Sequence, residues 1–430
     1  MKVRKVENID LTKFDEGIVA MEQGSAHSRT VSEKMFFDLF AQLFKEMRSA
    51  VDEGKPFIAS EMGMNTEIFS AMGITGSDSC MVAGMLNVFL HCQDEINSAA
   101  AAIGIRPEIC SPQRAPIGWF AKGWYPPPTA IVNCSLDQCD NMCQTGNLMG
   151  LLYDVPVFSF NRPYRWYTER GIEFMVGELE DTISFLEEVT GHKMDWDKLR
   201  EAAKMTLQQI ELSLAIHKLV MATPCPAKAG SGFYLHWIRM AYAGRQEGVD
   251  YCKTFLDEMK NMVDQGKGYA PKENYRLISL FTAPTGQHEV LEWLEQESGA
   301  VFVAEPMYYR YKEDEVAKVD ISKPLEALAR FYYLEPYYPY YGPLEEYLDM
   351  IVNDALESGA DGAVNWFNSK CRMGGAVART VKDTLKEKVG IPTVDFGVDI
   401  LDGTPAVGQS IKKQMEQFLM ILDNVKSKVA

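Results

Sequence analysis

Residues 129–163 read TAIVNCSLDQCDNMCQTGNLMGLLYDVPVFSFNRP, and this stretch sets the class of fold. Its first apolar run, 129–135, is typical of a buried strand. Residues 140–154 then have the composition of a helix that opens with Asp140. A second apolar run, 155–163, follows as the next strand. A strand, a helix and another strand in this order predict parallel strands in a sheet covered by helices.

The same alternation continues on both sides of this stretch. Before it, helices are expected at 31–53, 66–73 and 81–103, and a strand is expected at 56–62. After it, residues 171–266 have an almost wholly helical pattern. The alternation then returns, with strands expected at 275–281, 300–305, 361–367 and 391–399 and helices at 286–299, 344–359, 379–390 and 410–422. The chain thus contains two separate strand–helix alternations.

A chain of 430 residues is too long for one ordinary core, so two domains are expected. The predicted fold class is α/β, with two Rossmann-like domains that each contain a doubly wound parallel sheet. The expected division is an N-terminal helical segment at 1–54, a first α/β domain at 55–170, a helical connector at 171–270 and a second α/β domain at 271–430.

Composition excludes several classes of function. The formal net charge of -17 argues against nucleic acid as a partner, because phosphate binding needs a basic surface. Residues 1–17 are charged throughout, which argues against a secretory signal, and no apolar run is long enough to cross a bilayer. The protein is therefore expected to be cytoplasmic, where thiols stay reduced. Nine cysteines in that compartment indicate metal binding or catalysis rather than disulfides.

Cys110, Cys139 and Cys371 each lie in a loop at an expected strand-to-helix junction. Ligands of open α/β sheets bind beyond the carboxyl ends of the strands, and N–H groups at helix starts favour thiolates. Three thiolates from separate loops suit an iron–sulfur cubane with one iron left open. The alternative for any one of them is a buried cysteine that acts as a small apolar side chain. Zinc is disfavoured because the chain has no C-x2-C pair.

Three segments carry a resemblance to a known family. They are ICSPQRAPIGWF at 109–120, QCDNMCQTGNLMGLLYDVPVFSFNRPY at 138–164 and DGAVNWFNSKCRMGGAVARTVKDTLKEKVGIPTVDFGVD at 361–399. In order and spacing they resemble the cluster segments of the 2-hydroxyacyl-CoA dehydratase and benzoyl-CoA reductase family, and the likeness runs from about Lys55 to the C-terminus. The resemblance implies that Cys110, Cys139 and Cys371 hold an iron–sulfur cluster. It also implies that a separate ATP-hydrolysing iron–sulfur activator supplies the electrons.

The chain departs from the dehydratase pattern at further cysteines. Cys80 stands where dehydratases keep a glutamate near the substrate, and Cys225 lies in the counterpart of the segment that borders the acyl-CoA cavity. Cys143 follows Cys139 by four residues, which places both on one face of a helix. By resemblance, six thiolates imply the double-cubane cluster branch of the family, in which two four-iron cubanes share a sulfide in a homodimer. Cys134, inside an expected strand, is the alternative to Cys143 as the sixth ligand.

The function that this resemblance favours is low-potential reduction of a small molecule at a double-cubane 8Fe–9S cluster, in a cleft between the two domains. The first alternative is a subunit of a 2-hydroxyacyl-CoA dehydratase or benzoyl-CoA reductase with one 4Fe–4S cluster, in a heterodimer. The second is a non-enzymatic electron-storage protein. Glu61, Glu67 and His236 are candidates to act near the cluster, against the alternative of two solvated carboxylates and a structural histidine. The chain lacks the phosphate-binding loop of ATPases and is not expected to hydrolyse ATP itself.

Overall fold

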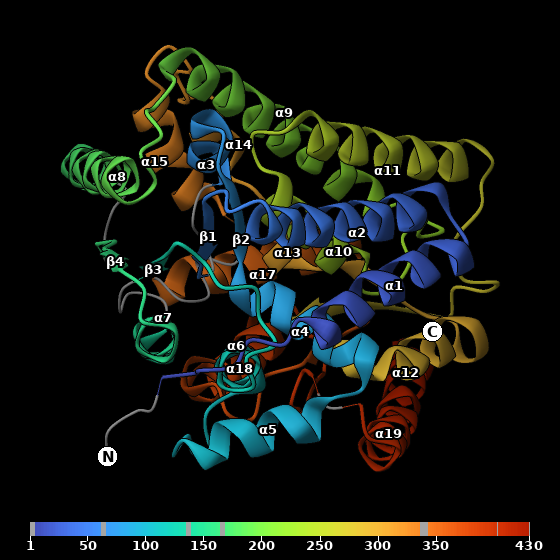
Figure 1. Cartoon of the computed structure of the whole chain (residues 1–430). Coiled ribbons are helices and arrows are strands. Elements are labelled where there is room, and N and C mark those ends of the chain that lie inside the picture. The colour runs from blue at the N-terminus through green and yellow to red at the C-terminus, as the bar shows by residue number, and fades with distance from the viewer. Residues whose placement is uncertain are drawn as a thin grey trace. The chain divides into compact units, whose positions relative to one another are not determined.

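The computed structural model describes residues 5–61, 66–134, 139–163, 168–335, 343–401 and 403–429 (Figure 1). The chain forms two compact units. Unit 1 comprises Met1–Glu211, Trp237–Thr254 and Lys312–Gly342, and unit 2 comprises Leu212–His236, Phe255–Tyr311 and Pro343–Ala430. Each unit contains a four-stranded sheet whose pairings are all parallel.

The sheet of unit 1 has the strand order β2-β1-β3-β4. Its strands are β1 (Phe57–Ser60), β2 (Thr75–Asp78), β3 (Ala130–Cys134) and β4 (Val157–Phe160). The strands predicted at 56–62, 129–135 and 155–163 are confirmed. The sequence of β2, TGSD, contains no apolar run, and it forms a strand because it pairs along its whole length with β1.

The sheet of unit 2 has the order β6-β5-β7-β8, which repeats the arrangement of unit 1. Its strands are β5 (Tyr275–Leu280), β6 (Ala300–Ala304), β7 (Gly362–Asn365) and β8 (Thr393–Asp395), so all four predicted strands are confirmed. In both sheets the first strand lies inside, the second at one edge, and the third and fourth on the other side. The prediction of two Rossmann-like parallel sheets is therefore confirmed. Ligands of such sheets bind where the strand order reverses, between β1 and β3 or between β5 and β7.

Helices surround both sheets. Those within unit 1 are α1 (Thr12–His27), α2 (Val31–Asp52), α3 (Thr66–Met72), α4 (Ser79–Leu90), α5 (Gln93–Ala102), α6 (Ser111–Ala121), α7 (Asp140–Tyr153), α8 (Glu169–Thr190), α14 (Glu313–Val316) and α15 (Pro324–Leu334). Those within unit 2 are α12 (His288–Trp293), α13 (Pro306–Tyr309), α17 (Leu344–Ser358), α18 (Arg372–Lys388) and α19 (Pro405–Val429), with the short turns η1 (Thr285–Gln287) and η2 (Leu294–Ser298). The helices α9 (Trp196–Val220), α10 (Ser231–Tyr242) and α11 (Gln246–Asp264) contribute residues to both units.

The helices α18 and α19 are longer than the predicted ranges 379–390 and 410–422, and two other predicted helices differ in kind from the structure. The helix expected at 81–103 is in fact α4 and α5, because His91 adopts a φ of 49°, a left-handed conformation that ends α4. The helix expected at 286–299 begins as the 3₁₀ turn η1 and ends as the π turn η2, which Gly299 closes with a φ of 68°.

The sequence of α2 shows how local signals form a helix and part of the core. Thr30 caps its start, and the Thr30 hydroxyl accepts a hydrogen bond of 3.1 Å from the N–H of Glu33. Phe36, Phe40 and Phe44 then recur every four residues and are buried on one face. The ring centroids of Phe36 and Phe40 lie 4.8 Å apart. Each such side chain contributes about 2 kcal/mol of burial free energy.

The core of unit 2 lies between its sheet and α19. Met415, Phe418 and Leu422 of α19 are buried in one cluster with strand residues. Trp366, which directly follows β7, is fully buried and stacks on Phe396 at 4.9 Å between ring centroids. Residues far apart in the sequence therefore hold the carboxyl end of β7 in place.

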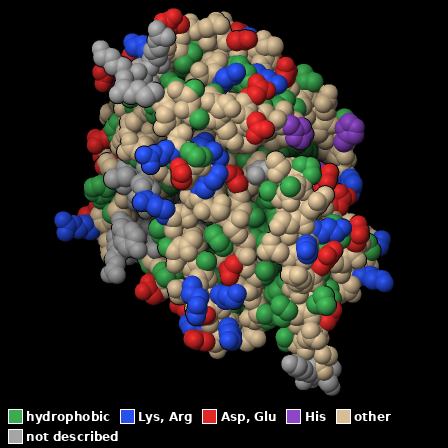
Figure 2. Space-filling model, turned by 90° about the horizontal axis from the view of Figure 1, so that it is seen from below, with side chains coloured by type: hydrophobic (Ala, Val, Ile, Leu, Met, Phe, Trp, Pro, Cys, Tyr) green, Lys and Arg blue, Asp and Glu red, His purple; other side chains and the backbone are tan. Residues whose placement is uncertain are grey.

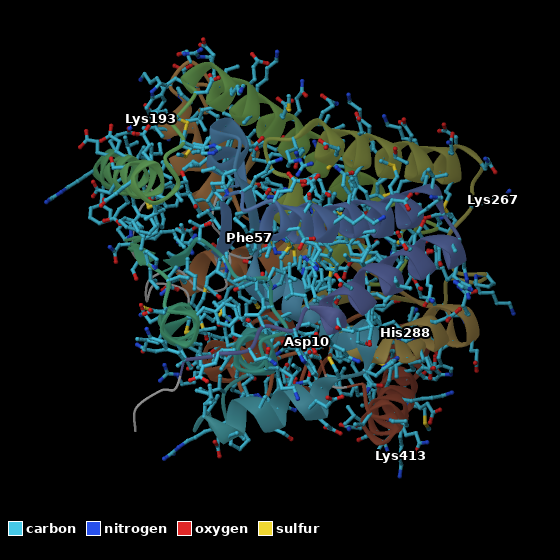
Figure 3. All side chains as sticks on the ribbon, in the orientation of Figure 1. Asp10, Phe57, Lys193, Lys267, His288 and Lys413 are labelled. Atoms are coloured by element: carbon cyan, nitrogen blue, oxygen red, sulfur yellow. The ribbon has the colours of Figure 1, made fainter. Side chains whose placement is uncertain are left out.

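The surface is charged, as the composition indicates. Phe57 at the start of β1 is buried, whereas Lys193, Lys267 and Lys413 are exposed and point outward (Figure 3). On the face drawn in Figure 2, acidic and basic side chains are interspersed. Among the described residues, no helix combines the length and the apolar character that a membrane span requires.

Candidate metal centre

Three cysteines singled out in the sequence each occupy the residue that caps the start of a helix. Cys110 precedes α6, Cys139 precedes α7 and Cys371 precedes α18. The first N–H groups of a helix have no partner within the helix, and they favour an anion such as a thiolate. The Cys371 side chain uses this position, since its Sγ accepts a hydrogen bond from the helix, whereas the side chains of Cys110 and Cys139 form no capping hydrogen bond to α6 and α7.

The connections that lead to these cysteines differ. Cys139 follows β3 along the chain and Cys371 follows β7, as predicted. The prediction that Cys110 also follows a strand is wrong, because the preceding element is α5. Gly104 ends α5 with a φ of 92°, and the turn that follows, which contains Pro107, leads directly into α6.

Cys371 already contacts the helix that it caps. Its Sγ accepts a hydrogen bond of 3.5 Å from the N–H of Gly374. Burial raises the pKa of the Cys371 thiol, while the N–H groups of Gly374 and Met373 act in the opposite direction. A metal bound at this sulfur displaces the proton, and the helix N–H groups then stabilise the thiolate.

Cys80 lies at the start of α4, directly after β2, and contacts the first turn of α6. Its Sγ donates to the carbonyl oxygen of Pro112 at 3.1 Å and lies 3.9 Å from Nε2 of Gln113. Burial raises the pKa of the Cys80 thiol most, and the negative charges of Asp78 and Glu61 and of the Cys110 and Cys139 thiolates raise it further. Cys80 therefore lies beside the start of α6, which Cys110 caps, and close enough to Cys110 and Cys139 for their charges to act on its thiol.

Cys143 lies one turn after Cys139 on α7 and is partly exposed. Its carbonyl oxygen accepts hydrogen bonds from Nδ2 of Asn133 at 2.8 Å and Nδ2 of Asn147 at 3.0 Å. The Asn147 side chain also approaches the Cys143 Sγ at 3.8 Å. The backbone of Cys134 belongs to β3, and its side chain lies outside the described residues.

Gly146 allows α7 to pack closely on β3. A Cβ at this position would lie 2.4 Å from the Asn133 side chain, which donates to the Cys143 carbonyl. We expect Gly146→Ala to lower the free energy of unfolding by about 1–3 kcal/mol, because the helix or Asn133 must move. Denaturant titration measures the effect. Gly177→Ala is the matched control, since a Cβ there meets nothing within 4 Å, and equal stabilities of the two variants would contradict the prediction.

Two buried carboxyl groups lie beside Cys80. Glu61 follows β1 and Asp78 ends β2, which pairs with β1. Ser79 donates to Oε1 of Glu61 at 2.6 Å, while the other carboxyl oxygen of each acid accepts no hydrogen bond from the described residues. Burial raises the pKa of Asp78 to about 7 and raises the pKa of Glu61 well above its usual value. These groups can therefore hold protons near neutral pH.

Glu67 on α3 is also buried, so the alternative that both glutamates are solvated carboxylates is wrong. Its Oε1 accepts a hydrogen bond of 2.7 Å from the Thr206 hydroxyl. Burial raises the pKa of Glu67 to about 7. Because the folded protein favours the neutral form, this carboxyl stabilises the fold fully below its unfolded pKa of 4.5, and the contribution is lost as the pH rises through about 7.

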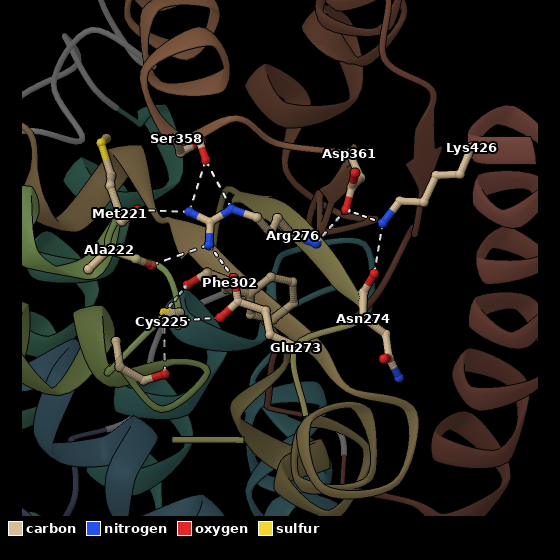
Figure 4. A network of polar contacts seen from close by, with 11 residues as sticks. Met221, Ala222, Cys225, Glu273, Asn274, Arg276, Phe302, Ser358, Asp361 and Lys426 are labelled. Atoms are coloured by element: carbon tan, nitrogen blue, oxygen red, sulfur yellow. Dashed lines mark hydrogen bonds and ion pairs between the residues drawn. The ribbon is translucent and has the colours of Figure 1, made fainter. Parts of the chain in front are cut away.

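Cys225 also belongs to unit 2 and lies beside Glu273 and Phe302 (Figure 4). Its side chain is fully buried, and its Sγ faces the carbonyl oxygens of Phe302 at 3.6 Å and Ala227 at 3.8 Å. Its N–H donates to Glu273, which precedes β5. The backbone N–H of Cys225 therefore lies toward the amino end of the sheet, whereas Cys371 follows the carboxyl end of β7.

The Cys225 sulfur contacts the middle of the sheet, because Phe302 is the third of the five residues of β6. Burial raises the pKa of the Cys225 thiol to about 12 and raises the pKa of the Cys80 thiol well above its usual value, so neither thiol ionises readily unaided. His236 on α10 is buried, with its ring 5.5 Å from the ring of Tyr308.

The candidate ligands are cysteine thiols, which are the type of side chain that binds iron–sulfur clusters. Within the described part of the chain, no three His, Cys, Asp or Glu side chains are already placed to hold a metal ion. Thiolates are nevertheless the usual ligands of iron–sulfur clusters, and Cys80, Cys110 and Cys139 lie within electrostatic reach of one another. The sequence analysis did not identify Asp78 as a candidate. The polar run TGSDSC at 75–80, which ends with Cys80, is the signal that could have revealed this acid.

Comparison with known proteins shows the family of the chain. The pattern of the family described as "2-hydroxyglutaryl-CoA dehydratase, D-component" matches residues 62–422. The chain is 24% identical to a benzoyl-CoA reductase subunit of Thauera aromatica, over 81% of this chain and 89% of that protein. It is 22% identical to the (R)-phenyllactyl-CoA dehydratase alpha subunit of Clostridium sporogenes, over 70% of this chain and 74% of that protein.

A third relative is the lactoyl-CoA dehydratase alpha subunit of Anaerotignum propionicum, which is 22% identical over 75% of this chain and 74% of that protein. These relatives are dehydratases and a reductase, so the prediction of an enzyme of oxidoreductase or dehydratase type is confirmed. The family match covers most of the chain and includes all three helix-capping cysteines. The chain belongs to the 2-hydroxyacyl-CoA dehydratase and benzoyl-CoA reductase family.

Proposed function

We propose that this chain is an iron–sulfur enzyme in which Cys110, Cys139 and Cys371 together bind one low-potential cluster. The observation that carries the proposal is the position of all three cysteines at the starts of helices. Each cysteine lies next to helix N–H groups that have no partner within the helix and can favour a thiolate. Membership of the family supports the same three residues, since they lie in the segments that carry the resemblance.

The position of Cys80 supports a cluster larger than one cubane. Its Sγ touches the first turn of α6, next to the helix start that Cys110 caps. Cys143 adds another sulfur one turn from Cys139. We therefore favour low-potential reduction of a small molecule at a double-cubane 8Fe–9S cluster. Cys225 can join the ligands only if its loop leaves the sheet, so it has the weakest support of the six.

The bound cluster supplies electrons, and the residues of the chain do the rest. The cysteines hold it, the apolar cores behind each sheet keep water away, and Glu61, fixed by Ser79, can hold a proton at the same end of the sheet. The electrons come from an ATP-dependent iron–sulfur activator, and the enzyme works as a homodimer in the cytoplasm. No sequence or structural feature of the described part of the chain favours nucleic acid as a partner.

A second candidate is a subunit of a 2-hydroxyacyl-CoA dehydratase or benzoyl-CoA reductase with one 4Fe–4S cluster. Two observations favour it. The relatives are subunits of such enzymes, and the burial of Cys225 against its sheet leaves fewer thiols for a second cubane. A non-enzymatic electron store has no comparable support, because the relatives are enzymes.

Counting iron and sulfide in protein purified without oxygen separates the two candidates. The double cubane requires about eight iron atoms per chain and the single cubane about four. Tight binding of an acyl-CoA thioester by the purified protein would favour the second candidate. A protein that binds no iron under these conditions would contradict both.

Cys80→Ala is expected to lower the iron content by about half if the double cubane forms, because the second cubane loses a ligand. The same variant of a single-cubane protein keeps its iron. Cys225→Ala is expected to leave the iron unchanged, since that sulfur faces carbonyl oxygens within the core. Iron analysis and the absorbance of the cluster measure the iron content of the two variants. An equal loss of iron in Cys80→Ala and Cys225→Ala would contradict the prediction that only Cys80 binds the cluster.

A further inference from the structure

Gln113 is a buried glutamine that does not cap the helix in which it lies. It is the third residue of α6, after the capping residue Cys110, and only 2% of its surface is exposed. A glutamine at this position commonly folds back to accept a hydrogen bond from the N–H of the capping residue. The Oε1 of Gln113 is instead buried and accepts no hydrogen bond from the described residues. A buried acceptor without a donor costs free energy, so the stability of the fold does not account for this glutamine.

The nitrogen of the Gln113 amide is directed at a sulfur. Its Nε2 lies 3.9 Å from Sγ of Cys80, within the range of an N–H···S hydrogen bond. The Cys80 thiol donates to the carbonyl oxygen of Pro112 at 3.1 Å, which places the sulfur against the first turn of α6. Once this sulfur has lost its proton to a metal it can only accept, and the Pro112 oxygen then opposes its charge. The Gln113 amide is a donor that favours the sulfur in its anionic form.

Asn147 presents an amide to a second sulfur in the same way. It lies one turn after Cys143 on α7, and its Nδ2 approaches Sγ of Cys143 at 3.8 Å. The same nitrogen donates to the Cys143 carbonyl oxygen at 3.0 Å, which holds the amide over this cysteine. Asparagine is a weaker helix former than leucine in the interior of a helix. The helix alone therefore does not favour an amide at this position either.

The two cysteines that receive these amides differ from the other proposed ligands in their place on a helix. The three helix-capping cysteines lie next to the N–H groups of a helix start. Cys80 and Cys143 do not cap a helix. Hydrogen bonds to the sulfurs are one of the factors that set the reduction potential of an iron–sulfur cluster. At Cys80 and Cys143, side-chain amides supply the donor that a helix start supplies elsewhere.

We infer that Gln113 and Asn147 are positioning residues that donate amide N–H groups to the Cys80 and Cys143 sulfurs of the bound cluster and make the cluster easier to reduce. This inference rests on the proposed function. A cluster becomes more negative when it takes up an electron, and an N–H donor at a sulfur stabilises the more negative form. Loss of one donor should therefore lower the midpoint potential. A typical hydrogen bond changes an equilibrium constant about fivefold, which is about 40 mV for a one-electron step.

Gln113→Leu in the iron-free chain tests whether the amide serves the fold. Leucine removes the unsatisfied Oε1 and keeps a side chain of similar size, so the free energy of unfolding should stay the same or rise. Asn147→Leu should likewise keep the fold, since leucine favours the helix. Denaturant titration measures both. A clear loss of stability in either iron-free variant would show that its amide stabilises the fold, and would overturn the inference for that residue.

In the iron-loaded protein, a redox titration followed by electron paramagnetic resonance gives the midpoint potential of the cluster. We expect Gln113→Leu and Asn147→Leu each to lower that potential by about 40 mV at an unchanged iron content. A loss of iron from a variant that folds normally would also support the inference, because the amide then holds a ligand in place. Wild-type iron content and wild-type potential in both variants would overturn it.

Gln209→Leu is the matched control. Gln209 is fully buried, and its Nε2 donates to the carbonyl oxygens of Tyr242 at 2.9 Å and Arg245 at 3.4 Å rather than to a sulfur. Its loss should lower the stability of the fold and leave the midpoint potential unchanged. Equal shifts of the potential in Gln209→Leu and Gln113→Leu would overturn the inference for Gln113.

The iron content of the wild type separates this inference from the proposed function. About four iron atoms per chain, or none, would defeat the proposed double cubane and the inference with it. About eight iron atoms, with potentials that neither amide affects, would defeat only the inference.

Discussion

Cys371→Ser is expected to remove most of the iron from the purified protein and to leave its fold intact. Serine is a preferred residue at the start of a helix, and its hydroxyl can accept from the N–H of Gly374 as the sulfur does. The side chain is only partly buried, so the change creates no large cavity. An alkoxide is a far poorer ligand for iron than a thiolate, so the cluster loses an anchor while α18 keeps its cap.

The measurement is iron and sulfide per chain, with circular dichroism as the test of folding. Cys252→Ala is the matched control, because Cys252 is fully buried in α11 and is not expected to bind metal. That variant should keep its iron even where its stability falls. A serine variant at 371 that binds as much iron as the wild type would remove this cysteine from the ligand set.

Arg276→Ala is expected to destabilise unit 2 by about 3–5 kcal/mol, because it leaves buried partners of the guanidinium without a donor. The guanidinium donates to the carbonyl oxygens of Met221 at 2.8 Å and Ala222 at 3.2 Å (Figure 4). It also donates to the carbonyl oxygen of Ser358 and forms an ion pair with Glu273. One side chain of β5 therefore ties together α17 and the chain after α9.

Denaturant titration of the whole chain measures this loss, and the transition of unit 2 must be followed separately because two units need not unfold together. Glu273 also accepts the N–H of Cys225, so the Arg276→Ala change should make the Cys225 thiol react faster with a thiol reagent. Arg276→Lys is the matched variant, since it keeps the charge but not the planar set of donors. A loss below about 1 kcal/mol in Arg276→Ala would contradict the structural role.

Local signals in the sequence are enough to predict most of the fold. The apolar runs that became β1, β3, β4 and the four strands of unit 2 are bounded by turn residues, and the helices between them have regular spacing. These local signals do not predict β2, because TGSD is polar and owes its strand conformation to pairing with β1. They fail again at His91, where a single left-handed residue divides one expected helix.

The candidate centre was predictable only in part. The sequence predicts that Cys139 and Cys371 lie at helix starts, because each stands in a loop directly before an amphipathic run. The location of Cys225 could not be predicted, because contacts with Glu273 and Phe302, far away in the sequence, determine it.

The helix starts beneath Cys110, Cys139 and Cys371 have a consequence for energetics. Each is equivalent to about half a positive elementary charge, so the three together offset about half the charge of three thiolates. Less anionic surroundings make an added electron easier to hold and harder to give away. The three helix starts would thus make a bound cluster easier to reduce than three uncompensated thiolates would.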